Sequence, residues 1–258
     1  MKVKKTISRV LTALLIAVIA VLGLFSAQRL TEYELQHQDN LSVVNEARKQ
    51  FYEEDNDDHE TVSTDIPQED FLTRYNAMKE KNPDYACWLK ISDTSIDHPV
   101  MQASESNPSY YLHHNINRKW DSYGSLLVSS SCTVDSDNVI IYGHHMRDGT
   151  MFSVLDRYRK SKWANGHRLI ELITDKEHRY YEVVAVLIQD ASHPDIVWED
   201  HTDFDTQGKS YHYGIECVRR SKVDFEYEPT GEETYLTLVT CEYSHENGRL
   251  LVVARRVQ

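Results

Sequence analysis

One cysteine near the C-terminus stands where a thiol can act as a nucleophile. Cys241 ends a β-rich run at 235–241 (YLTLVTC), and Arg249 begins a second run at 249–256 (RLLVVARR). The polar segment between the runs contains Asn-Gly, which is a hairpin signal. A hairpin brings the end of one strand beside the start of the next, so we expect the thiol and the guanidinium to lie side by side. A cation fixed there would favour the nucleophilic thiolate and could stabilise an oxyanion.

The alternative for this cysteine is a structural role, because free cysteine is among the most buried residue types. A histidine motif favours the chemical interpretation. The segment 142–146 (YGHHM) continues an apolar run at 138–142 (NVIIY), so it places histidine just past a predicted strand end. Histidine titrates near neutral pH, and a cysteine with a distant histidine is the usual pattern of a nucleophile and its proton partner.

Together these motifs resemble those of the sortase family. The segment 237–241 (TLVTC) followed by Arg249 is similar to the TLxTC…R signature of sortases, and 142–146 is similar to the histidine motif of their class B. Upstream, two segments resemble the first two strands of the class B domain, 88–91 (WLKI) and 96–100 (IDHPV).

The resemblance implies a cysteine transpeptidase with a role for each residue. Cys241 would attack the carbonyl of a threonine in a sorting signal and form a thioacyl intermediate. His144, which the family motif selects over His145, would protonate the departing amine, and a base would deprotonate the incoming one. Arg249 would hold the substrate carbonyl and its developing charge, with the backbone N–H of Glu242 as a second oxyanion donor. No cofactor is implied.

The resemblance also implies the partners. They would be surface proteins that bear a sorting signal, and an amine acceptor on a peptidoglycan precursor or a pilin. The formal net charge of −13 argues against nucleic-acid binding, which requires a basic face. The organism implied is a Gram-positive bacterium.

Other titratable residues near the motifs have simpler interpretations. The side chain of His145 should point away from that of His144 if the backbone is extended there. His245, in the hairpin connector, is interpreted as solvated. His113 and His114 are interpreted as surface residues, with a role at the rim of a cleft left open.

The four cysteines do not make a disulfide scaffold in a chain of 258 residues. If Cys241 stays reduced, then Cys87, Cys132 and Cys217 allow at most one bridge. Many class B members carry an acidic residue where this chain has the neutral segment 128–132 (VSSSC), so Cys132 is either a structural cysteine or a second reactive thiol. No cysteine or histidine spacing is typical of zinc, and we expect no metal.

The N-terminus is predicted to anchor the chain in a membrane. Residues 10–25 (VLTALLIAVIAVLGLF) are almost wholly apolar and, extended to Ala27, approach the roughly 20 residues that a membrane helix needs. The basic residues before them should stay cytoplasmic, which predicts a single-pass cell-membrane protein with an extracellular catalytic domain. A cleaved signal peptide is the alternative, but Phe25 fits the small-residue cleavage rule poorly.

The rest of the chain is divided by composition. We expect a cytoplasmic tail and anchor at 1–28, a helical stalk and acidic linker at 29–65, and a sortase-like catalytic domain at 66–258. Many short strands and only short helices predict a mainly β fold, a closed β-barrel of about eight strands with a helix at its N-terminus. The long segment 190–231 is predicted to form a cleft wall with a helix at 209–220, before the cysteine strand.

Two other functions remain open. A papain-like cysteine peptidase would use the same residue types, but such enzymes place the cysteine early and the histidine late, the reverse of the order here. A non-catalytic, membrane-tethered surface-binding module would use the barrel without chemistry. Such a module would be indifferent to the loss of Cys241.

Overall fold

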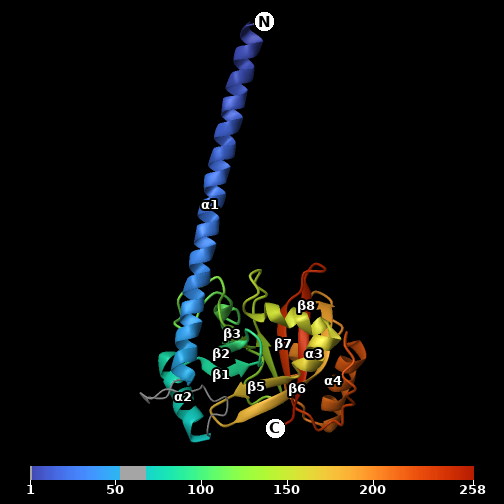
Figure 1. Cartoon of the computed structure of the whole chain (residues 1–258). Coiled ribbons are helices and arrows are strands. Elements are labelled where there is room, and N and C mark those ends of the chain that lie inside the picture. Colours follow the sequence, from blue (N-terminus) through green and yellow to red (C-terminus); the bar gives the residue numbers. More distant parts are fainter. Residues whose placement is uncertain (1, 53–67) are drawn as a thin grey trace. The chain divides into compact units, whose positions relative to one another are not determined.

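The computed structural model describes residues 2–52 and 68–258, and the chain divides into two compact units between Ser42 and Val43. Helix α1 (Lys2–Tyr52) runs through the first unit (Figure 1). Among the described residues it is the one helix long and apolar enough to cross a membrane. Its large apolar side chains from Leu11 to Phe25 are exposed. The acidic linker and the domain start expected at residue 66 lie outside the described residues.

Eight strands of the second unit close into a barrel (Figure 1). They are β1 (Tyr85–Lys90), β2 (Asp97–Gln102), β3 (Leu126–Val128), β4 (Asn138–Tyr142), β5 (Leu169–Ile173), β6 (His178–Asp190), β7 (Tyr235–Cys241) and β8 (Gly248–Arg256). Around the barrel they follow the order β1-β2-β3-β4-β7-β8-β6-β5. Neighbours are antiparallel except for the parallel pairs β2–β3 and β4–β7. The predicted mainly β closed barrel is confirmed.

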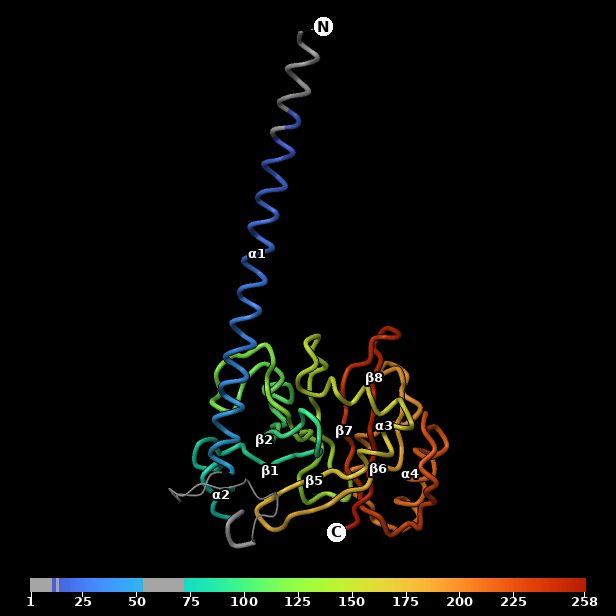
Figure 2. Tube along the Cα trace, viewed as in Figure 1, coloured from blue at the N-terminus to red at the C-terminus, as the bar shows by residue number. Residues whose placement is uncertain are grey.

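Helix α4 (Gln207–Arg220) covers the outside of the barrel at β6 (Figure 2). It begins after Thr206, whose side-chain oxygen accepts a hydrogen bond from the N–H of Lys209 at 3.3 Å and so caps the helix. On its buried face, Tyr213 shares a 2.8 Å hydrogen bond with Thr237 of β7. The helix expected at 209–220 is therefore confirmed, with its start two residues earlier.

The described residues contain five other helical segments, of which α2 is as long as α4 and the rest are shorter. They are α2 (Gln68–Lys81), α3 (Ser161–Gly166) and the 3₁₀ segments η1 (Tyr110–Leu112), η2 (Phe152–Arg159) and η3 (Trp198–Asp200). The segment η2 follows the histidine motif and is the one that matters most for the site, because four of its side chains are buried against the barrel.

A second cluster of buried side chains contains the end of α1 together with residues of β1, β2, β3 and β5. Phe51 is fully buried and stacks on Trp88 of β1, with ring centroids 4.3 Å apart and planes 7° apart. Asp97 accepts hydrogen bonds from the indole of Trp88 at 2.6 Å and from the hydroxyl of Tyr52 at 2.8 Å. Arg48 pairs with the same carboxylate at 3.0 Å. Residues 43–52 therefore belong to the same compact unit as the barrel.

The strand register brings the chemistry-bearing segments to one end of the barrel. β4 and β7 are parallel, so their C-terminal ends coincide, and the start of the antiparallel β8 lies beside them. β3 begins at this end because Leu127 pairs with Tyr142, and β2 is parallel to β3. The β1–β2 turn, the segment before β3, the loop after β4 and the β7–β8 hairpin therefore share this end.

Candidate active site

Cys241 and Arg249 form the last residue pair of the β7–β8 ladder. The hairpin continues one step further, because the N–H of Glu242 donates to the carbonyl of Gly248 at 2.9 Å. Asn247 adopts a left-handed φ of 55°, and a Cβ at Gly248 would collide with the Glu242 carbonyl oxygen. The Asn-Gly pair is thus needed for the turn, and Cys241 and Arg249 lie opposite each other in the ladder, as the hairpin signal predicted.

The thiol of Cys241 differs from the other three in its surroundings. All four cysteines are free, and Cys241 is partly exposed whereas the others are buried. Burial raises the pKa of the Cys132 thiol to about 11 and that of the Cys217 thiol to about 12, and it also raises the pKa of Cys87. Burial disfavours the thiolate of Cys132 and so favours the structural role of the two alternatives.

His144 is held close to the end of the cysteine strand by its neighbour. Tyr142 pairs with Val239, and the hydroxyl of Thr240 donates to the carbonyl of Gly143 at 2.8 Å. Gly143 and Thr240 are thus bonded to each other, and His144 and Cys241 are the residues that follow them in the chain. A side chain at position 143 would collide with neighbouring side chains of β3 and η2, which is why glycine is required there.

The imidazole of His144 is bonded and half-buried. Its Nε2 lies 2.8 Å from the carbonyl oxygen of Leu112. A carbonyl oxygen only accepts hydrogen bonds, so Nε2 carries a proton and Nδ1 has the lone pair in the neutral ring. Burial lowers the pKa of His144, the bond to Leu112 raises it in part, and the charge of His113 lowers it. The ring is therefore neutral at neutral pH.

The side chains of His144 and His145 point to different partners, as expected: Nε2 of His144 faces the carbonyl of Leu112, whereas His145 turns to the cysteine strand. Its Nδ1 lies 2.8 Å from the carbonyl oxygen of Cys241, and its own carbonyl accepts from the hydroxyl of Tyr243 at 3.2 Å. His145 forms an antiparallel β-bridge with Met151, whose φ is 53°, so the loop folds back between these two residues.

Arg249 directs its guanidinium to the hairpin turn. Its Nη1 donates to the carbonyls of Gly248 at 3.0 Å and of Asn247 at 3.4 Å. Within residues 2–52 and 68–258 no carboxylate forms an ion pair with it, so its charge is not neutralised by a described partner. A cation without a carboxylate is suited to hold a developing negative charge.

The side chain of Glu242 and its partner Arg159 were not singled out from the sequence. The carboxylate of Glu242 is 3% exposed and accepts from Arg159 of η2 at 3.0 Å. Its other oxygen accepts from the N–H and the hydroxyl of Ser244, at 3.0 and 2.6 Å. Burial raises the pKa of Glu242, but the bonds from Ser244 and the charges of Arg159 and His245 bring it below its usual range. Glu242 is therefore ionised.

Two further groups border this end. The hydroxyl of Tyr142 donates to Glu199 of η3 at 2.6 Å and accepts from the indole of Trp198 at 2.7 Å, which joins the segment 190–231 to β4. His113 places its ring 5.9 Å from that of His144, whereas His114 stacks on Tyr110 with centroids 3.8 Å apart. Of the two histidines left open, only His113 adjoins His144.

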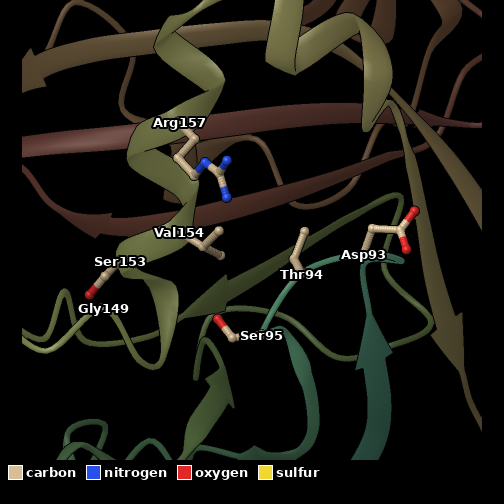
Figure 3. Close-up of a pocket in the computed structure, with 7 residues that line it drawn as sticks. All are labelled: Asp93, Thr94, Ser95, Gly149, Ser153, Val154 and Arg157. Carbon is tan, nitrogen blue, oxygen red and sulfur yellow. The ribbon is translucent and has the colours of Figure 1, made fainter.

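A pocket of about 430 Å³ opens at the same end, between the β1–β2 turn and η2 (Figure 3). Its lining residues are Asp93, Thr94, Ser95, Gly149, Ser153, Val154 and Arg157. Figure 3 shows the side chain of Arg157 extending from η2 toward Thr94. The hydroxyl of Ser153 donates to the carbonyl of Met146 at 2.5 Å, so the pocket adjoins the loop that carries His144.

Comparison with known proteins gives consistent matches. The Sortase domain family model matches residues 89–257. Sortase B of Staphylococcus aureus is 28% identical over 195 residues, 74% of this chain and 78% of that protein. Sortase B of Listeria monocytogenes is 26% identical over 263 aligned positions, 100% of this chain and 99% of that protein. The X-ray structure of Clostridium perfringens sortase B is 29% identical with a TM-score of 0.63, covering 71% of this chain and 99% of that chain.

Proposed function

Because this chain belongs to the sortase family and is similar to sortases of class B, we propose that it is a membrane-anchored cysteine transpeptidase. It cleaves a sorting signal at a threonine residue and transfers the acyl group to an amine of the cell wall or of a pilin. The observation that carries the proposal is the convergence of Cys241, Arg249 and the loop of His144 at one end of the barrel.

The first step forms a thioester. The sulfur of Cys241 bonds to the threonine carbonyl carbon, and the C–N bond to the following residue breaks as the departing amine takes up a proton from His144. Because Nε2 of His144 is engaged with Leu112, Nδ1 is the nitrogen that takes the proton of the Cys241 thiol and delivers it to the departing amine. In the second step, an incoming amine loses a proton to a base and displaces the sulfur.

The oxyanion of each tetrahedral intermediate is held by Arg249 and by the backbone N–H of Glu242. In the free protein this N–H donates to Gly248, so it serves the substrate only if that bond is shared or opened. The guanidinium also donates to Gly248 and has further N–H groups to offer. Arg249 is therefore the principal donor and Glu242 the second.

The proposed partners follow from this chemistry. One is a surface protein with a sorting signal, and the other is a peptidoglycan precursor or pilin that supplies a free amine. The apolar part of α1 crosses the cell membrane once, with the basic N-terminal residues in the cytoplasm and the barrel outside. Residues 190–231 form one wall of the substrate cleft, supported by the bonds of η3 to Tyr142.

The test is a transfer assay with the full chain in detergent micelles. A peptide library with a central threonine is mixed with an amine-bearing acceptor peptide, and mass spectrometry follows the protein and the products. We expect an acyl adduct on Cys241, transfer to the acceptor, and neither with Cys241→Ala. If the peptide were hydrolysed and no acyl group reached the acceptor, the protein would be a cysteine peptidase. Binding with no adduct would mean a non-catalytic module.

A further inference from the structure

The loop after β4 is bonded to the end of β7 on both sides of His144. On one side, the carbonyl of Gly143 accepts from the hydroxyl of Thr240 at 2.8 Å. On the other side, Nδ1 of His145 lies 2.8 Å from the carbonyl oxygen of Cys241. Residues 143 and 145 are thus tied to residues 240 and 241, and the backbone of His144 lies between the two bonds.

The second bond acts on the peptide group that joins Cys241 to Glu242. A carbonyl oxygen only accepts, so Nδ1 of His145 carries the proton and donates. A hydrogen bond to a peptide carbonyl polarises that peptide and strengthens its N–H as a donor. The N–H of this peptide is that of Glu242, which donates to Gly248 in the free protein.

The hairpin also donates a hydrogen bond to the backbone of His145. The hydroxyl of Tyr243 donates to the carbonyl of His145 at 3.2 Å, and the two rings lie 5.1 Å apart between centroids. His145 is therefore joined to the hairpin through its side chain and through its backbone. The side-chain bond needs an N–H at the position of Nδ1, which most residue types cannot supply.

We propose that His145 is a positioning residue: it holds the loop of His144 in register with Cys241 and orients the Glu242 peptide. This assignment rests on the proposed transpeptidase function for its kinetic consequence. Its structural consequence, the fixed Glu242 peptide, is independent of any activity.

Three variants of the full chain test the assignment. His145→Leu removes the donor at similar size, whereas His145→Asn keeps an N–H close to the position of Nδ1. His167→Leu is the matched control, because Nδ1 of His167 also lies 2.8 Å from a backbone carbonyl, that of Trp163, outside the site. The measurements are kcat and KM for acyl transfer, amide hydrogen exchange of 240–243 by mass spectrometry, and thermal midpoints.

We expect His145→Leu to lower kcat about tenfold, the usual effect of one lost hydrogen bond, with KM nearly unchanged. Exchange at 240–243 should quicken by a similar factor. His145→Asn should restore most of the parent kcat and of the slow exchange at 240–243, and His167→Leu should change neither quantity. Parent kcat in His145→Leu, or no recovery in His145→Asn, would overturn the assignment.

The two proposals fail separately. If the parent chain transferred no acyl group, the proposed function would fall, and hydrogen exchange would still decide the role of His145. If His145→Leu did not fold, Tyr243→Phe would replace it, because it removes the bond to the backbone of His145 and leaves the ring in place. Parent-like exchange at 240–243 in Tyr243→Phe, beside an unfolded leucine variant, would make His145 a fold residue only.

Discussion

The guanidinium of Arg249 and the backbone N–H of Glu242 donate to one oxygen, the carbonyl of Gly248, at 3.0 and 2.9 Å. The two groups proposed to hold the substrate oxyanion are therefore already aimed at a common acceptor. A peptide carbonyl is chemically similar to the substrate carbonyl. Little rearrangement is needed for the substrate oxygen to take over at least one of these donors.

Arg249→Lys should lower kcat/KM for acyl transfer by about a hundred- to a thousandfold, a loss of roughly 3–4 kcal/mol. Lysine keeps the charge but loses the planar fork, whose separate nitrogens can donate to Gly248 and to a substrate oxygen in a fixed geometry. Steady-state kinetics with one sorting-signal peptide measure the effect. If the lysine variant turned over every peptide at the parent rate, the role of Arg249 would be wrong.

Iodoacetamide should modify Cys241 alone in the folded protein, because it is the one partly exposed thiol of the four. Peptide mapping by mass spectrometry identifies the modified residue, and protein unfolded in guanidinium should react at every cysteine. Burial raises the pKa of Cys132 to about 11, which keeps its reactive thiolate scarce. Modification of Cys132 at a rate like that of Cys241 would restore it as a second reactive thiol.

Arg159→Gln should lower the free energy of unfolding by about 2–3 kcal/mol, because it leaves the buried Glu242 carboxylate without its cation. The same guanidinium pairs at 3.0 Å with Asp156, whose side chain is 46% exposed. Asp156→Asn is thus the matched control and should cost less than about 1 kcal/mol. Urea unfolding measures both. Equal losses of unfolding free energy in the two variants would show that the pair with buried Glu242 contributes no more than the exposed pair with Asp156.

Phe51→Ala should destabilise the barrel unit by about 3–5 kcal/mol, since it removes a fully buried ring stacked on Trp88. Gln50→Ala changes an exposed neighbour on the same helix and should shift stability by no more than about 0.5 kcal/mol. Thermal and urea unfolding test both. If the Phe51→Ala protein were as stable as the parent, residues 43–52 would contribute nothing to the stability of the barrel unit.

His98 should make the protein sensitive to acid. Burial, with the charge of Arg48, lowers its pKa to about 4, so between pH 6.5 and about 4 the unfolded chain binds a proton that the folded chain does not. Stability from this group is full above pH 6.5 and is lost as the pH falls toward 4, by about 3 kcal/mol. His98→Gln should reduce the difference in unfolding free energy between pH 7 and pH 4.5. An unchanged difference would refute this.

The strands and α4 could be predicted from the sequence because their signals are local. Apolar runs such as 138–142 and 235–241 form strands, and Asn-Gly marks the β7–β8 turn. Strand order could not be predicted in this way, since the parallel pairing of β4 with β7 joins residues far apart in the chain.

The same limit explains which site residues were missed. Arg159 and Glu242 are 83 positions apart, and Leu112, the partner of His144, lies 32 positions before it. No spacing rule connects such residues. The partner of the His145 side chain, the carbonyl of Cys241, is likewise 96 positions away in the chain.

The bond between Thr240 and Gly143 joins residues 97 positions apart, and it forms only when the parallel strands β4 and β7 meet. Such non-local contacts arise late and slowly during folding, because a long intervening chain must first be ordered. Before that moment the thiol and the imidazole are independent side chains of a flexible polymer. Completion of the barrel is therefore the event that brings Cys241 and His144 to one end of the fold, and the proposed chemistry depends on it.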